Sequence, residues 1–113
     1  MDDLKGRTRK YALRIITLYE ALPSRGAGQV LAHQVLRSGT SVGAHYREAV
    51  RSRSRAEYIA KLNGGLMELE ETLYWLELIE ESHQVKTEKL ALLKNETDQL
   101  IRILVRLIKN WKR

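Results

Sequence analysis

Apolar residues recur at alternating steps of three and four through the second half of the chain, and this spacing constrains the possible folds most strongly. The first series comprises Ile59, Leu62, Leu66, Leu69, Leu73 and Leu76. The second series comprises Leu90, Leu93, Thr97, Leu100, Leu104, Leu107 and Trp111. A heptad spacing of this kind gathers apolar side chains along one face of a helix. It therefore predicts two long helices that pack against other helices.

The first half of the chain predicts two further helices. The segment Leu4–Leu22 carries an apolar stripe and ends at a Pro-Ser-Arg-Gly sequence, which stops a helix. A second helix is expected from about Gly28 to about Arg53, and Ser54 and Glu57 form a capping box that begins the next one. Because short connections join the four helices, neighbouring helices should lie antiparallel. We expect one all-α domain over residues 1–113, an antiparallel up-down-up-down four-helix bundle.

Composition excludes several other classes of protein. The chain has 113 residues with one proline and no cysteine, and 43% of its residues are hydrophobic. The lack of cysteine excludes a disulfide framework and thiol chemistry, and the apolar content argues against disorder. No apolar run reaches the 18 or so residues of a membrane span, and the amino terminus lacks the apolar stretch of a signal peptide. We therefore expect a cytoplasmic protein with no membrane partner.

The last predicted helix carries more apolar surface than one bundle face requires. Between Leu100 and Ile108 only two arginines are polar, whereas a bundle helix needs an apolar face about 100° wide. Contiguous exposed apolar patches mark interfaces. We interpret the surplus as a homo-oligomer interface, for which the candidate residues are Trp75, Leu78, Ile101, Val105 and Ile108. The alternative is a deeply buried helix whose arginines extend to solvent.

Polar residues share one face of the second predicted helix. They step by three and four residues and comprise Ser38, Ser41, His45, Glu48 and Ser52. Small residues at Gly39, Gly43 and Ala44 would let a neighbouring helix approach closely. If the face points inward, its polar groups must satisfy one another. We expect Ser38, Ser41, His45 and Glu48 to form a buried hydrogen-bond network; a ligand or catalytic site and a solvated face are the alternatives.

The same segment resembles a known family. Residues 36–49, Leu-Arg-Ser-Gly-Thr-Ser-Val-Gly-Ala-His-Tyr-Arg-Glu-Ala, are similar to the signature of the bacterial four-helix-bundle proteins, also called 23S rRNA intervening-sequence proteins. Residues 53–62 and 68–78 fit the family as well, so the resemblance covers nearly the whole chain. It implies an antiparallel four-helix bundle assembled as a homopentamer, and it implies no known reaction.

The resemblance also bears on partners and on the polar face. The related accessory variability determinants of diversity-generating retroelements share the bundle and the pentamer, and they bind nucleic acid and a reverse transcriptase. By match to the signature, Ser38, Ser41 and Glu48 take the family's inward polar positions. The family usually has asparagine where this chain has His45, and an imidazole cannot reproduce both groups of an amide. We therefore expect a rearranged network around His45.

Basic residues concentrate in the first half of the chain, where residues 1–60 carry 11 basic and 5 acidic groups. In an up-down-up-down bundle, the start of the first helix, the junction of the second and third helices and the end of the fourth meet at one end. That end would collect 14 of the 20 basic groups and four of the 14 acidic ones. The candidate nucleic-acid contacts there are Lys5, Arg7, Arg9, Lys10, Arg47, Arg51, Arg53, Arg55, Lys109, Lys112 and Arg113.

Nucleic-acid binding is the interpretation that we favour for this charge. The arginine fork suits phosphate, and Tyr11, Tyr46, Tyr58 and Trp111 could stack on unpaired bases. Helix dipoles favour cations at the ends of helices and disfavour them at the start, so they do not explain the basic first helix. The alternatives are a solvated basic end with no partner and an acidic protein partner.

Motifs for catalysis are weak. His33 and His45 lie 12 residues apart on one helix, and residues 80–83 contain a single Glu-x-x-His, whereas a di-iron bundle needs two such motifs. The glycines of residues 26–28 do not form a dinucleotide loop. We expect no metal, no cofactor and no enzymatic activity. The predicted function is that of an oligomeric, nucleic-acid-binding bundle, and the alternative is a protein–protein interaction scaffold.

Overall fold

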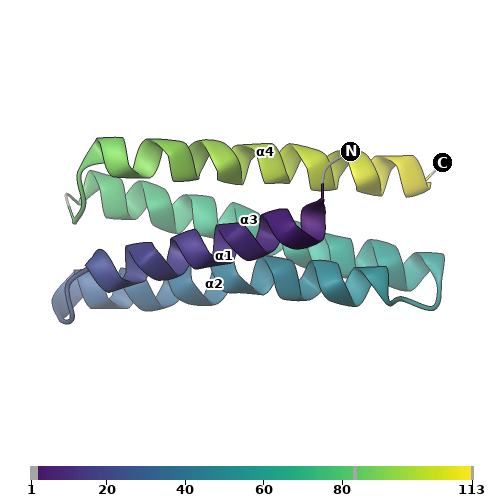
Figure 1. Ribbon diagram of the computed structural model, residues 1–113, viewed down its shortest axis with the longest axis horizontal. Coiled ribbons are helices and arrows are strands. Elements are labelled where there is room, and N and C mark those ends of the chain that lie inside the picture. Colours follow the sequence, from purple (N-terminus) through teal and green to yellow (C-terminus); the bar gives the residue numbers. More distant parts are fainter. Residues whose placement is uncertain (1–2, 83, 113) are drawn as a thin grey trace.

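The computed structural model describes residues 3–82 and 84–112, and within them the chain forms four α-helices and no strand. The helices are α1 (Leu4–Ala21), α2 (Gly26–Val50), α3 (Arg55–Glu81) and α4 (Thr87–Lys112). Figure 1 shows them side by side in a rod whose extents are 44 × 21 × 20 Å, with the three connections at alternating ends. The four predicted helices are confirmed, and the arrangement is consistent with a four-helix bundle.

Local sequence signals explain where the helices begin. Asp3 precedes α1, and its carboxylate accepts a hydrogen bond from the Gly6 amide at 3.1 Å. Ser54 precedes α3, and its hydroxyl oxygen accepts from the Glu57 amide at 3.0 Å. The carboxylate of Glu57 accepts from the Arg53 amide at 3.5 Å. The serine cap is therefore as predicted, while the glutamate reaches one residue farther back than a capping box requires.

The buried row of α3 differs from the predicted one by half of its members. Leu62, Leu69 and Leu76 are at most 1% exposed, whereas Ile59, Leu66 and Leu73 are only partly buried. The buried residues of α3 are Leu62, Gly65, Leu69, Thr72, Leu76 and Ile79, which also step by three and four. The prediction placed Leu66 and Leu73 in the core, but the buried positions are the preceding residues, Gly65 and Thr72. The predicted row is therefore a neighbour of the buried one. On α4 the predicted row is buried from Leu90 to Leu104 and ends at Trp111, which is 46% exposed.

Glycines allow α1 and α2 to pack closely. Gly39 and Gly43 are buried against α1, as the run of small residues predicts, while Ala44 is exposed. A Cβ atom at Gly39 would lie 2.7 Å from Cγ1 of Ile15, and one at Gly43 would lie 3.2 Å from Oγ1 of Thr8. The α2 helix also packs along α3, and α3 along α4, while the backbones of α1 and α4 come close at few positions.

None of the helices in residues 3–82 and 84–112 is long and apolar enough to cross a membrane.

Candidate nucleic-acid interface

Three helices bring cations to one end of the molecule, which we call the basic end. It is the end at which α2 finishes, α3 begins and α4 finishes, on the right of Figure 1. The exposed cations there are Arg47, Arg51, Arg53, Arg55 and Lys109. Lys112 is the last residue of α4, and its side chain, like all of Arg113, lies outside the described part of the chain.

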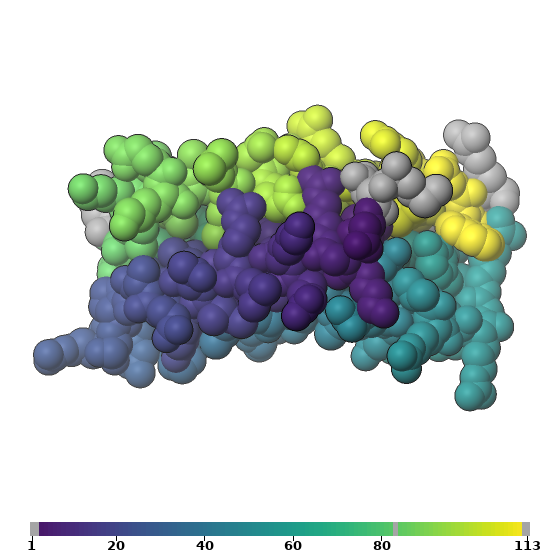
Figure 2. Space-filling model, in the orientation of Figure 1, coloured from purple at the N-terminus to yellow at the C-terminus, as the bar shows by residue number. Residues whose placement is uncertain are grey.

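The start of α1 lies beside the basic end rather than at its tip. The α1 helix has 18 residues and α2 has 25, so α1 begins short of the point where α2 finishes (Figure 1). Figure 2 shows this purple segment between the teal end of α2 and the yellow end of α4. Lys5, Arg9 and Lys10 are exposed. At 1.5 Å per residue, Arg9 and Lys10 lie roughly 6 to 8 Å farther from the tip than Lys5.

Arg7, a predicted nucleic-acid contact, is held by α4 instead. Its Nε donates to Oε2 of Glu96 at 2.7 Å, and its Nη2 donates to Oε1 of Glu96 at 2.9 Å and to Gln99 at 2.7 Å. The two hydrogen bonds to Glu96 make a bidentate ion pair, which is the strong form of this interaction. Arg7 holds the pKa of the Glu96 carboxyl below its usual value. Arg7 is therefore not available as a nucleic-acid contact, because its guanidinium is bound within the molecule.

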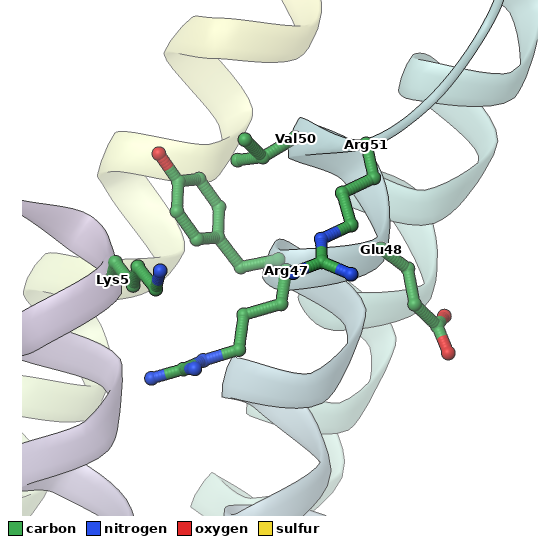
Figure 3. Close-up of a pocket in the computed structure, with 6 residues that line it drawn as sticks. Lys5, Arg47, Glu48, Val50 and Arg51 are labelled. Carbon is green, nitrogen blue, oxygen red and sulfur yellow. The ribbon is translucent and has the colours of Figure 1, made fainter.

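A pocket of about 330 Å³ lies where α1 begins beside the last turns of α2. Its lining residues are Lys5, Tyr46, Arg47, Glu48, Val50 and Arg51. Figure 3 shows Lys5 extending from α1 and the two arginines from α2, while the carboxylate of Glu48 points away from Lys5. Three cations from two helices thus border one recess.

The charge of this pocket is only weakly compensated. Within the described residues, no ion pair engages Lys5, Arg47 or Arg51, and none engages Arg53 in the following connection. Glu48 lies 3.4 Å from Nζ of Lys61, so part of its charge is balanced from α3. The basic end is therefore cationic in its local charge as well as in its composition.

Aromatic rings accompany the cations. Tyr46 is partly buried in the pocket, and burial, followed by the charges of Tyr58 and Asp3, raises its pKa. The rings of Tyr58 and Trp111 lie 5.2 Å apart, and the guanidinium of Arg55 lies 5.8 Å from the Trp111 ring. Tyr11 is different: it is 1% exposed, so its ring cannot stack on a base, contrary to the prediction.

The predicted buried network of α2 does not form. Ser38 is fully buried, but Ser41 is partly exposed and donates only to the carbonyl of Arg37 at 2.7 Å. The Glu48 side chain is 53% exposed. His45 lies 3.7 Å from Glu48 through Nδ1, a separation beyond hydrogen-bonding distance. The prediction fails because Gly39 and Gly43 face α1, which turns most of the polar row toward the surface.

A different set of polar groups occupies the core, and four of its hydroxyls link the helices in two pairs. Tyr11 lies 2.6 Å from Thr97, and Ser38 lies 2.7 Å from Thr72. Each threonine donates its single hydroxyl proton to the carbonyl four residues earlier. Tyr11 and Ser38 must therefore be the donors of the two bonds between helices. Ser38 was identified from the sequence as a buried polar residue, and Thr97 stood out as the threonine in a row of leucines. Tyr11 and Thr72 carried no signal for these bonds.

The predicted interface residues divide into two groups. Trp75, Leu78, Ile101 and Val105 are partly buried in the single chain and keep some exposed surface. Ile108 is 6% exposed and belongs to the core, so it cannot contribute to an interface, and that prediction is wrong. It lies one position past Leu107, which is only partly buried, so the buried row of α4 shifts by one residue near the end of the helix. The indole Nε1 of Trp75 is buried with no hydrogen-bond partner among the described residues.

No group of three or more histidine, aspartate or glutamate side chains in the described ranges could hold a metal ion. His45 is the candidate with the most carboxylate neighbours, namely Glu48 and Glu68, each 3.7 Å from a ring nitrogen. A metal ion requires ligands at about 2 Å in a defined geometry. The carboxylates near His45 are therefore too far from the ring to share a metal ion with it.

Comparison with known proteins identifies the relatives of this chain. Residues 3–106 match the family described as 23S rRNA-intervening sequence protein. A crystal structure of a protein of unknown function from the S23 ribosomal protein family of Bacteroides thetaiotaomicron is similar, with 39% sequence identity and a TM-score of 0.88. The similarity covers 93% of this chain and 97% of that one. No curated protein matches the sequence.

Proposed function

The chain belongs to the family of the 23S rRNA-intervening sequence proteins, and from this premise we propose that it is a non-enzymatic, homo-oligomeric bundle whose basic end binds the phosphate backbone of nucleic acid. The observation that carries the proposal is the set of exposed cations at the basic end that no described ion pair engages. Among them are Lys5, Arg47, Arg51 and Arg53.

Helix dipoles account for only part of this charge. Arg47 and Arg51 lie at the end of α2, where the dipole favours a cation. Lys5 lies in the first turn of α1, where the dipole disfavours one. Its position beside the two arginines of α2 needs another explanation, and an anionic ligand supplies it. Phosphate suits the planar guanidinium group because it accepts two parallel hydrogen bonds.

Oligomerisation would extend the basic end into a larger surface. We infer an antiparallel up-down-up-down bundle, which the alternating connections in Figure 1 support, and a homo-oligomer, which the partly exposed apolar residues Ile101 and Val105 support. The family resemblance implies a pentamer. In a cyclic oligomer whose symmetry axis runs along the helices, the basic ends lie on one side and form a ring, because rotation about that axis keeps equivalent ends at the same height.

Salt-dependent binding tests the proposal. Fluorescence anisotropy with labelled RNA and DNA at about 50 mM and about 200 mM salt should show an affinity that falls steeply with salt. Replacement of Arg47, Arg51 and Arg53 by alanine should weaken binding. It should also lower the slope of log K against log salt by about 0.7 to 0.9 for each phosphate that the variant no longer neutralises.

The matched control replaces Arg25, Lys86 and Lys89, three exposed cations at the opposite end. This variant has the same net charge as the first, and it should bind almost as well as the unmodified protein. Equal weakening by the two variants would show a response to net charge alone and would contradict a defined basic end. No binding at low salt would overturn the proposal in favour of a protein–protein interaction scaffold.

A further inference from the structure

The pocket beside Tyr46 combines features that neither phosphate binding nor solvation requires. We propose that it holds one unpaired nucleotide, with the phosphate between Lys5, Arg47 and Arg51 and the base against Tyr46 and Val50, so that the basic end prefers single strands to duplexes. This inference rests on the proposed nucleic-acid binding and specifies which form of nucleic acid is bound.

The cations are placed to hold one phosphate group. Arg47 and Arg51 are four residues apart on α2, so their side chains lie on the same face of the helix, one turn apart. Lys5 approaches the recess from α1 (Figure 3). The volume of about 330 Å³ falls at the lower end of the range of roughly 300–1,000 Å³ for small-ligand pockets. The recess is therefore suited to one nucleotide rather than to a length of duplex.

The apolar part of the lining distinguishes a nucleotide from a simple anion. Val50 is 60% exposed although cations flank it, and Tyr46, four residues earlier, is partly buried. Together they give the pocket an aromatic and aliphatic wall next to its charged rim. Unpaired bases stack on aromatic side chains in this way, and stacking tolerates any base because every base has a flat face.

The geometry also explains a preference for single strands. In a duplex the bases are stacked inside the helix and only their edges are accessible, so a ring in a recess cannot reach a base face. Two acidic residues border the site. Glu48 points away from Lys5 and lies near Lys61, and the carboxylate of Asp3 accepts the Gly6 amide at the start of α1. The Glu48 carboxylate is thus directed away from Lys5, and the Asp3 carboxylate is engaged by the first turn of α1, although its charge acts on Tyr46.

Binding of single strands and duplexes of the same sequence tests the inference, with RNA and DNA in separate arms. The unmodified protein should bind the single strand more tightly. Tyr46→Leu should weaken single-strand binding by about five- to a hundredfold and leave duplex binding unchanged, while Tyr46→Phe, which keeps the ring, should retain the affinity. Tyr74→Leu is the control, because Tyr74 is an exposed tyrosine (53%) on α3 that does not line the pocket.

Two further variants test the wall of the pocket and its cations, and they guard against misfolding. Val50→Glu places a carboxylate at the pocket from an exposed position, so it should weaken single-strand binding without affecting the fold, as thermal unfolding would check. Arg47→Ala with Arg51→Ala should lower the salt slope for single strands by about 0.7, because the two arginines hold one phosphate. The tyrosine variants should leave that slope unchanged, because they remove no cation.

The outcomes distinguish this inference from the proposed function. Equal affinity for single strands and duplexes, or a Tyr46→Leu variant that weakens both equally, would overturn the nucleotide pocket while leaving backbone binding in place. A folded Val50→Glu variant with unchanged single-strand affinity would overturn it too. No binding of either form at low salt would overturn the proposed function, and the pocket with it.

Discussion

Four buried hydroxyl groups tie the helices together at the level of single residues. Tyr11 donates to Thr97 across α1 and α4, and Ser38 donates to Thr72 across α2 and α3. A one-residue slip of any helix would separate these partners and leave a buried polar group unsatisfied, which costs about 1–3 kcal/mol. The hydroxyls therefore fix the register of helices whose leucines alone would tolerate sliding.

Removing the Tyr11 hydroxyl tests this role. Tyr11→Phe deletes the donor, while Thr97 keeps its bond to the Leu93 carbonyl at 2.8 Å. Because no buried donor is left unsatisfied, the free energy of unfolding should fall by only about 0.5–1.5 kcal/mol, as urea denaturation would measure. Tyr74→Phe, at an exposed ring, is the control and should change nothing. An equal effect of the two substitutions would contradict the role assigned to the buried hydroxyl.

The ion pair between Arg7 and Glu96 makes stability depend on pH. Hydrogen bonds from Arg7 lower the pKa of Glu96 in the folded protein below its ordinary value of 4.5. The stabilisation is therefore present above that value and is lost as the pH falls through the lower, folded-state pKa.

Glu96→Gln should reduce the free energy of unfolding at pH 7 by about 1 kcal/mol. It should also flatten the decline in stability at pH values below the ordinary pKa of glutamate, as urea midpoints across a pH series would measure. Glu70→Gln is the control, since Glu70 is exposed and no described ion pair engages it. A decline that is as steep in Glu96→Gln as in the unmodified protein would contradict the role of this pair.

At the scale of the elements, the close packing of α1 and α2 depends more on Gly39 than on Gly43. A methyl group at Gly39 would overlap the side chain of Ile15, which is fully buried and cannot move aside. Gly39→Ala should destabilise the protein by about 1–3 kcal/mol, although alanine is the better helix former by about 1 kcal/mol.

Gly43→Ala is the matched comparison on the same face of α2. There the nearest atom would be Oγ1 of Thr8 at 3.2 Å, a tight contact rather than an overlap. We expect this variant to be close to neutral, because a small adjustment relieves the contact and the gain in helix propensity offsets it. Thermal or urea unfolding of the two variants checks the difference, and equal stabilities would contradict the tight approach at Gly39.

The elements also show how far the sequence predicts this fold. Helix number and most helix bounds follow from periodicity and from the Pro23 and Ser54 signals. The buried row of α3 does not, because Gly65 and Thr72 occupy core positions for reasons outside their own helix. Gly65 lies under Leu104 and His45, and Thr72 receives the hydroxyl of Ser38. Periodicity therefore shows that α3 has a buried face, but it does not show which of two neighbouring rows of residues is buried.

At the scale of the whole molecule, the candidate site is partly predictable. Chain direction alone indicates that cations far apart in sequence meet at one end, and the pocket of Lys5, Arg47 and Arg51 fits that expectation. Chain direction does not predict which acidic residue each of these cations pairs with. Nothing near Arg7 in sequence indicates that Glu96, 89 residues away, holds its guanidinium. The α1 helix is also shorter than α2, so Arg9 and Lys10 lie along the side of the molecule and not at the tip of the basic end.

The oligomer proposed for this protein makes a prediction at the same scale. Ile101 and Val105 are partly exposed on α4 and line a surface recess between Arg102 and Arg106. Substituting glutamate at both positions would bury two carboxylates in a largely apolar interface, at a cost of several kcal/mol. Light scattering should then show the mass falling toward the 13.1 kDa of one chain. Leu92→Glu is the control, since Leu92 is 72% exposed on the same helix.

The proposed interface and the basic end would be coupled through this oligomer. If the basic ends form a ring, the dissociated Ile101→Glu, Val105→Glu variant presents fewer cations to one strand, so its affinity and its salt slope should both fall although no cation has been removed. Anisotropy titrations of this variant beside Leu92→Glu measure the effect. A variant that dissociates but binds with unchanged slope would show that one basic end is sufficient, and a protein that is already monomeric would contradict the interface itself.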